Sequence, residues 1–255
     1  MLFGPHMQNV SQAGAPPAGS EIVNSAPVVV ELFTSEGCSS CPPADALLAR
    51  ISKSSSFAGA QIIAIAEHVD YFNSLGWADP YSKKQFTARQ QGYVDAMHLK
   101  EVYTPQMIVD GRTGFLGHNE AAARAAIASA AKAPKATVKV QVDSLKGNAL
   151  TLKVDVGTVP ATDAGEMADL LVGITEDNLR SSVTSGENAG RKLAHMRVLR
   201  GIKNIGVAGK ATISETANVT LQEAWKKGDL YAIVLVQGHD SGHIYGAAQL
   251  EIQKK

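Results

Sequence analysis

The chain contains only two cysteines among its 255 residues, and both lie in the motif Cys38-Ser39-Ser40-Cys41. A small secreted protein that relies on disulfides for stability has several cysteines at wide spacing. A bond between Cys38 and Cys41 would close too short a loop to restrict the unfolded chain much, so it would contribute little stability. The scarcity of cysteine therefore indicates a chemical role for this pair.

The sequence also lacks an excess of charge of either sign and any long apolar run. Lys plus Arg and Asp plus Glu number 24 each, a balance that gives no sign of a nucleic-acid partner. No stretch approaches the roughly 20 apolar residues of a transmembrane helix, and the longest apolar runs, such as Tyr231–Val236, have the length of a strand. We therefore expect no nucleic-acid partner and no transmembrane segment in this chain.

The first 25 residues have the composition of a segment outside the fold. Gly4-Pro5-His6-Met7 is typical of a cloning remnant, and residues 8–24 are rich in Ala, Gly, Pro and Ser. Such a remnant implies that a signal peptide preceding Gln8 has been removed. We assign residues 1–25 to this remnant and a flexible leader.

Residues 26–131 alternate strand and helix signals, because short apolar runs rich in β-branched residues alternate with stretches at helical spacing. Asp110-Gly111 between two such runs is a hairpin signal. The order predicts a βαβαββα core with parallel strands at its helical crossovers. Its elements are expected at Pro27–Phe33, Ala44–Ser54, Gln61–Ala66, Asp79–Asp95, Gln106–Val109, Thr113–Leu116 and Asn119–Ala131.

The pattern changes after a linker at residues 132–136. Residues 137–255 contain repeated strand signals with turns between them, such as Lys146-Gly147-Asn148, and this favours an antiparallel β-sandwich-like domain. Within it, we expect the segment of Arg191 and His195 to be a strand and to take part in a polar network between the two domains. Strands are expected at Thr137–Val142, Leu150–Val156, Asp169–Thr175, Ala211–Leu221, Leu230–Gln237 and Ile244–Ile252.

The motif of the two cysteines occurs in zinc, iron–sulfur and redox sites, and its context favours the redox reading. It follows a buried strand and opens a helix, a position that lowers the pKa of a thiol and populates the attacking thiolate. Cys38 would be the nucleophile and Cys41 the resolving thiol. Two features oppose this activation: Pro42 and Pro43 place the start of the helix at Pro43, and the nearby carboxylate of Glu36 opposes a thiolate.

Three alternatives to catalysis stay open. The cysteines could be an inert pair. They could bind a soft metal such as Cu(I), with His68 or His98 as a third ligand. The chain could also be a non-catalytic adaptor that binds a partner through its fold.

Other polar and aromatic residues are candidates for a supporting role. Glu67, His68 and Asp70 follow a predicted buried strand, where they could assist proton transfer or complete a metal site; they could equally be a solvated strand end. Trp77 could contact a substrate, although an anchoring role for the segment around it is favoured. Tyr103 could line a peptide groove.

Several passages of the chain resemble one family, the bacterial, predicted-secreted domain-of-unknown-function 1223 family. The resemblance covers nearly the whole chain after the leader, with Phe72 as a departure where tryptophan is expected. The passages are Glu31–Asp45, Glu67–Asn73, Gly76–Pro80, Val102–Gln106, Val109–Gly111, Gly186–Asn188 with Arg191, His195 and Arg200, and Gly246–Ala248.

This resemblance implies an α/β thioredoxin-like domain over residues 26–131, followed by the β-rich domain over residues 137–255. It also implies export, and hence a periplasmic or secreted protein. A thioredoxin-like fold places a cis-proline opposite the disulfide, and Thr104-Pro105 lies where that proline is expected. The function we expect is thiol–disulfide exchange with protein thiols or a redox partner, in either direction. The expected cofactor is none beyond a redox-active Cys38–Cys41 disulfide.

Overall fold

The computed structural model describes residues 1 and 26–253, so the expected remnant and leader lie almost wholly outside the described residues. The first half of the described chain contains three α-helices and four strands in the predicted order. Within the described residues, no helix is long and apolar enough to cross a membrane. The elements are β1 (Val28–Thr34), α1 (Pro42–Lys53), β2 (Ile62–His68), α2 (Lys84–Ala96), β3 (Gln106–Val109), β4 (Thr113–Leu116) and α3 (Glu120–Ala130), with a 3-10 turn η1 (Asn73–Leu75) before α2.

The second half consists of strands joined by turns and short 3-10 segments. Six of its strands lie within or around the predicted runs, a seventh lies in the segment of Arg191 and His195 that was expected to be a strand, and two were not predicted. The six are β5 (Val138–Lys146), β6 (Ala149–Val156), β7 (Ala168–Glu176), β11 (Ile213–Thr220), β12 (Leu230–Gly238) and β13 (Ile244–Glu251). The seventh is β9 (Lys192–His195), and the strands that were not predicted are β8 (Leu179–Ser182) and β10 (Val198–Ala208).

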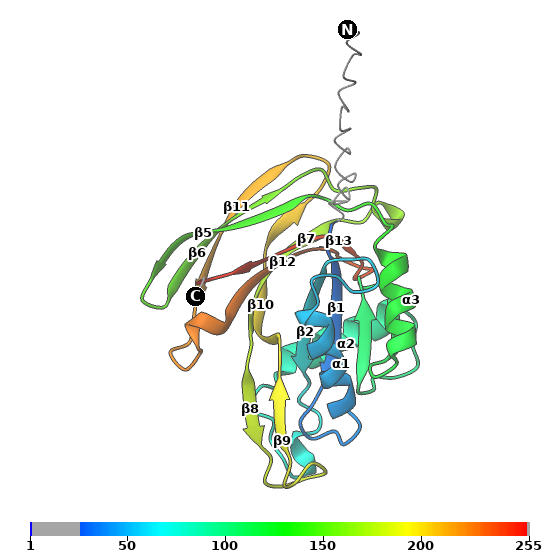
Figure 1. Ribbon diagram of the computed structural model, residues 1–255, viewed down its shortest axis with the longest axis vertical. Coiled ribbons are helices and arrows are strands. Elements are labelled where there is room, and N and C mark those ends of the chain that lie inside the picture. The colour runs from blue at the N-terminus through cyan, green and yellow to red at the C-terminus, as the bar shows by residue number, and fades with distance from the viewer. Residues whose placement is uncertain (2–25, 254–255) are drawn as a thin grey trace.

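The predicted fold class, an α/β thioredoxin-like domain followed by a β-sandwich-like domain, is wrong. The described part of the chain is mostly β, with 41% strand and 19% helix. One mixed sheet of eight strands, in the order β13-β12-β7-β10-β2-β1-β3-β4, contains strands from both halves (Figure 1). The two halves join where β10 pairs with β2 through Val198 and Ala66. The division into domains at residues 26–131 and 137–255 stays a prediction.

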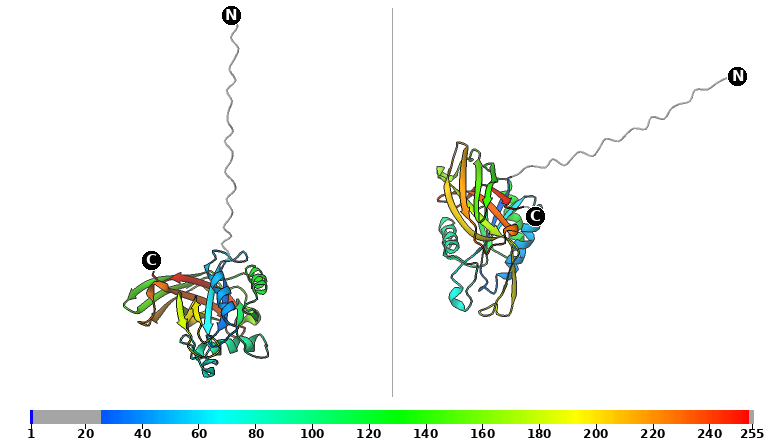
Figure 2. Two further views of the ribbon diagram at one scale, coloured as in Figure 1. Left: turned by 60° about the horizontal axis from the view of Figure 1, so that its bottom comes forward. Right: turned by 90° about the vertical axis from the view of Figure 1, so that its left-hand side faces the viewer.

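The three largest apolar clusters among the described residues cover this sheet. One face of β1, β2 and β3 packs against α1 and α3, because α1 places Ala44, Leu47, Leu48 and Ile51 on one side. On the other face, Phe86 of α2 packs with residues of β1, β2, β10, β12 and β13, so this cluster includes both halves. A separate sheet, in the order β11-β6-β5, packs over the part of the large sheet formed by the second half (Figure 2).

The predicted hairpin at Asp110-Gly111 is confirmed, and its tip lies against the second half of the chain. Both residues have positive φ, at 48° and 64°, as this turn type requires. The N–H of Ile244 donates to the carbonyl of Asp110 over 2.9 Å. A Cβ on Gly111 would lie 2.0 Å from the carbonyl oxygen of Gly242. Glycine at this position therefore permits the close approach of two hairpins.

Gly111→Ala is expected to lower the free energy of unfolding by about 3 kcal/mol, since overpacking adds to the cost of a positive φ. Gly147→Ala is the matched control: Gly147 has a φ of 60° and open space around the position of a Cβ, so this variant should lose only about 1 kcal/mol. Urea denaturation of both variants makes the comparison. Equal losses in the free energy of unfolding would show that the close approach to Gly242 does not add to the effect of Gly111→Ala.

Candidate functional site

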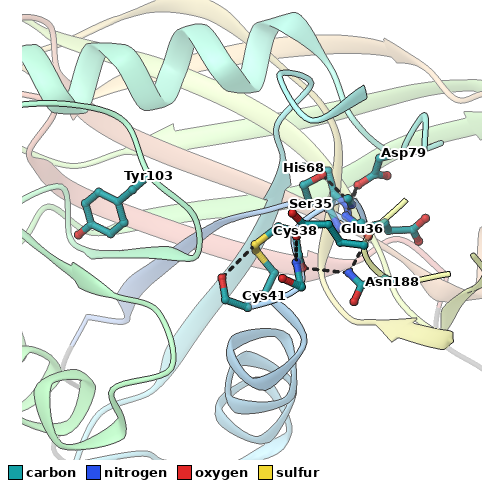
Figure 3. The surroundings of a disulfide bond; sticks show 12 residues. Ser35, Glu36, Cys38, Cys41, His68, Asp79, Tyr103 and Asn188 are labelled. Atoms are coloured by element: carbon teal, nitrogen blue, oxygen red, sulfur yellow. Dashed lines mark hydrogen bonds and ion pairs between the residues drawn. A yellow bond between two sulfur atoms is a disulfide. The ribbon is translucent and has the colours of Figure 1, made fainter. Parts of the chain in front are cut away.

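The loop between β1 and α1, residues 35–41, holds a disulfide between Cys38 and Cys41 (Figure 3). Helix α1 begins at Pro42, two residues before the predicted span Ala44–Ser54 and one before the start at Pro43 that the two prolines indicated, and Cys41 is its N-cap. The N–H groups of Ala44 and Asp45 donate to the Cys41 carbonyl over 2.9 and 3.1 Å. Because Pro42 and Pro43 have no N–H, few donors of this helix end are free to stabilise a thiolate.

Both sulfur-bearing residues are buried. Cys38 exposes 2% of its surface and Cys41 none, whereas Ser39 and Ser40 between them are exposed. The Ser40 hydroxyl lies 3.4 Å from Cys38 Sγ, within hydrogen-bond distance for sulfur. Cys38 is thus the slightly more exposed of the two cysteines, but another molecule reaches it only after the covering residues move.

Glu36, two residues before Cys38, lies in a buried polar network that joins the two halves of the chain. Trp77 Nε1 donates to its Oε2 over 2.8 Å, and His195 Nε2 lies 2.9 Å from its Oε1. Burial by itself raises the pKa of Glu36. The hydrogen bonds from His195 and other donors together have the larger effect, so the pKa of Glu36 lies below its ordinary value. The polar network expected at His195 is therefore present. The hydrogen bond from Trp77 to Glu36 attaches the segment around Trp77 to this network, which is the anchoring role that was favoured.

His68, the last residue of β2, forms a second buried pair beside the first. Its Nδ1 lies 2.7 Å from Asp79 Oδ2, and the same oxygen accepts the backbone N–H of Glu36 over 2.8 Å. Burial lowers the pKa of His68, but the Asp79 carboxylate outweighs this and raises it. Burial conversely raises the pKa of Asp79, and the His68 cation outweighs it and lowers that pKa. The His68 and His195 rings meet edge to face, with centroids 4.8 Å apart.

The loop between β8 and β9 covers the disulfide loop. Asn188, fully buried, donates from Nδ2 to the backbone carbonyls of Glu36 and Cys38 over 2.8 and 2.9 Å. The adjacent Glu187 accepts the N–H of Ser39 over 2.9 Å. On the other side, Phe72 packs so tightly on Gly37 that a Cβ there would lie 2.8 Å from it. We call residues 183–191 the covering loop.

The structure does not bring Glu67 and Asp70 into this network. Glu67 neighbours His68 in β2, so its side chain points to the opposite face of the sheet, where Arg89 Nε lies 3.2 Å from it. Burial raises the pKa of Glu67 well above its ordinary value, and the attraction of Arg89 does not offset it. Asp70 accepts the hydroxyl of Thr87 over 2.6 Å. Glu67 and His68 are both fully buried, so they are not a solvated strand end.

The Thr104–Pro105 peptide bond is cis, as expected. Pro105 is buried, and its carbonyl accepts the N–H of Gly117 over 2.8 Å. Tyr103 is half-buried, and Figure 3 shows it on the opposite side of the disulfide from Glu36, His68 and Asp79. The roles of Thr104, Pro105 and Tyr103 toward a substrate stay predictions.

Asp45 is a site residue that sequence reasoning missed. It lies four residues after Cys41, on the same side of α1, and interacts electrostatically with His195 and His68. Burial raises its pKa, which the two histidines lower only in part. Its helical spacing from Cys41 was the available signal; for Asp79 and Asn188 the only one was their place in passages that resemble the family.

Within the described part of the chain, no group of three or more His, Cys, Asp and Glu side chains is arranged to hold a metal ion. The metal-binding alternative through Cys38, Cys41 and His68 therefore has no supporting geometry in the disulfide form, in which both sulfurs are bonded to each other.

Two solved structures are similar to most of this chain. A crystal structure of an Agrobacterium tumefaciens protein from a structural genomics consortium has 27% identity and a TM-score of 0.70, over 89% of this chain and 95% of that one. HBP35 of Porphyromonas gingivalis has 17% identity and a TM-score of 0.64, over 89% of this chain and 76% of that one, and this likeness concerns the fold alone. No curated protein matches the chain. The profile of the family described as "Protein of unknown function (DUF1223)" matches residues 29–237, and the chain belongs to that family.

Proposed function

We propose that the protein performs thiol–disulfide exchange through Cys38 and Cys41. The observation that carries the proposal is the disulfide itself: the only two cysteines of the chain are bonded to each other at the start of a helix, in a loop held by a buried polar network. The substrates we propose are protein thiols or disulfides, or a redox partner protein. The compartment we propose is the periplasm or the cell exterior, where disulfides persist.

The exchange balances in either direction. As an oxidant, the protein accepts attack of a substrate thiolate on Cys38 Sγ, which breaks the Cys38–Cys41 bond and releases Cys41 as a thiolate. A second substrate thiol then displaces Cys38 and carries away the new substrate disulfide. As a reductant, the Cys38 thiolate attacks a substrate disulfide and releases one substrate thiolate, and the Cys41 thiolate then attacks Cys38 Sγ, releases the second and re-forms the Cys38–Cys41 bond. The Ser40 hydroxyl supports the Cys38 thiolate by hydrogen bonding in both cases.

Cys38→Ser is expected to abolish exchange, whereas Cys41→Ser should accumulate a mixed disulfide at Cys38, because it retains the attacking thiol and lacks the resolving one. Insulin reduction measures activity, and mass spectrometry after alkylation measures the mixed disulfide. Equilibration of the wild-type protein with dithiothreitol and glutathione buffers measures the Cys38–Cys41 couple.

Two outcomes would contradict the proposal. One is wild-type activity no higher than that of the double cysteine-to-serine variant. The other is a folded protein whose disulfide is not reduced by excess dithiothreitol. A double variant that keeps full biological function would instead support the adaptor alternative.

A further inference from the structure

A pocket lies apart from the disulfide, on the side of β10 that faces the β11–β12 connection. Its volume is about 250 Å³. The residues that line it and bear on its chemistry are Lys83, Arg200, Ile202, Lys203, Val219 and Trp225. We call it the basic pocket.

The charge of the basic pocket has one sign. Lys83, Arg200 and Lys203 line it, and no acidic residue does. Arg200 pairs with Glu176, outside the lining, at 3.5 Å. Among the described residues, neither lysine has a carboxylate partner: each donates to a backbone carbonyl, that of Arg200 for Lys83 and that of Asn218 for Lys203. Burial and the Arg200 charge lower the pKa of Lys83, as expected for an ammonium group that lacks a counter-ion.

Two hydrogen-bond donors on residues of the pocket wall lack an acceptor within the described chain. Arg200 Nη1 and Trp225 Nε1 are both buried and without a partner. A buried donor left unsatisfied costs about 1–3 kcal/mol, and an entering anion would supply acceptors after a local shift of these covered side chains. The absence of a carboxylate partner for the two lysines and the unsatisfied donors of Arg200 and Trp225 are independent observations, and both indicate a negatively charged ligand.

Part of the wall is apolar, although Gln85, Thr220 and Gln222 also line the pocket. Ile202 and Val219 are half-buried, and Trp225 exposes only 7% of its surface. Its indole ring lies 5.5 Å from the Arg200 guanidinium carbon. An inorganic anion would leave these apolar surfaces in contact with water, whereas an organic acid would cover them. The small volume limits the ligand to a small molecule.

From these observations we propose that the basic pocket binds a small organic acid, with its carboxylate toward Lys83 and Arg200 and its apolar body against Ile202, Val219 and Trp225. This site is separate from the cysteines and does not depend on the proposed exchange activity.

Titration with sodium benzoate, followed by the two indole N–H resonances in NMR spectra of the ¹⁵N-labelled oxidised protein, tests this site. Saturable movement of the Trp225 resonance is expected, whereas the Trp77 resonance should stay in place because Glu36 accepts its N–H. Trp225→Phe assigns the two signals. Lys83→Met and Lys203→Met should each weaken benzoate binding at least fivefold. Lys210→Met, which alters an exposed lysine outside the pocket, should leave it unchanged.

Benzyl alcohol and inorganic phosphate separate the two parts of the ligand. Each should bind at least tenfold more weakly than benzoate, since the first lacks the charge and the second lacks the apolar body. Either compound matching benzoate would overturn the assigned ligand class. A Trp225 resonance that does not respond to benzoate, or a response that both folded lysine variants retain in full, would overturn the site.

Discussion

Asp79→Asn is expected to lower the free energy of unfolding by about 3–5 kcal/mol near pH 5.5, because it leaves a buried cation without its partner. Asp79 Oδ2 accepts from both His68 and the backbone N–H of Glu36, and its Oδ1 accepts the N–H of Tyr81 over 2.9 Å. An asparagine at this position would turn one of these acceptors into a donor.

The loss should depend on pH in a defined direction. The folded-state pKa of Asp79 is lowered, so its stabilisation is present above the ordinary value of 3.8 and is lost as pH falls through the folded-state pKa. The folded-state pKa of His68 is raised, so its stabilisation is complete below 6.5 and is lost as pH rises through the folded-state pKa. The difference between wild type and variant is therefore largest between about pH 4 and 6.5.

Urea denaturation at about pH 5.5 and pH 9 measures both effects. Asp95→Asn is the control, because Asp95 is exposed and its substitution should change stability by less than about 0.5 kcal/mol. A loss of under 1 kcal/mol for Asp79→Asn at the lower pH would contradict the importance of the pair. An equal loss at both pH values would assign the effect to packing rather than to charge.

Asn188→Ala is expected to raise the rate at which dithiothreitol reduces the Cys38–Cys41 disulfide by about tenfold. A reductant must wait for the covering loop to open, since Cys38 is 2% exposed. Asn188 holds the loop closed with two hydrogen bonds to the backbone of Glu36 and Cys38. Each bond contributes about 0.5–1.5 kcal/mol net, and about 1.4 kcal/mol corresponds to a factor of ten in the opening equilibrium.

Ser185→Ala is the matched control on the same loop. The Ser185 hydroxyl donates to the carbonyl of Gly76 over 2.6 Å and does not touch the disulfide loop. Its loss should change the reduction rate less than twofold. A wild-type rate in Asn188→Ala, or equal acceleration in both variants, would contradict the gating role of Asn188. The reduction rates are compared in the absence of urea, after circular dichroism has confirmed that both variants are folded.

The elements of the first half were predictable because each has a local signal. β1 is buried along its whole length and reads as a short apolar run, and the Asp110-Gly111 turn lies between two such runs. The position of β10 was not predictable in this way. Its pairing with β2 involves one residue on each strand, and no periodicity in either segment indicates the contact. This one junction makes the large sheet continuous and accounts for the wrong fold class.

The residues of the candidate site were also predictable only in part. Cys38 and Cys41 were predicted from their spacing and context, whereas the residues that hold their loop come from distant parts of the chain. Asp79 lies 11 residues from His68, but His195 lies 159 residues from Glu36. Pairs so far apart leave no pattern within a local window. Family-like passages pointed to their importance but not to their partners.

The position of the covering loop late in the sequence also determines when the disulfide loop can be covered during synthesis. Asn188 follows Cys38 by 150 residues, so a ribosome adding roughly 5–20 residues per second makes it roughly 8–30 s later. During that interval the two cysteines exist without the residues that later bury them. The covering loop can therefore close over the Cys38–Cys41 bond only after at least 150 further residues have been made.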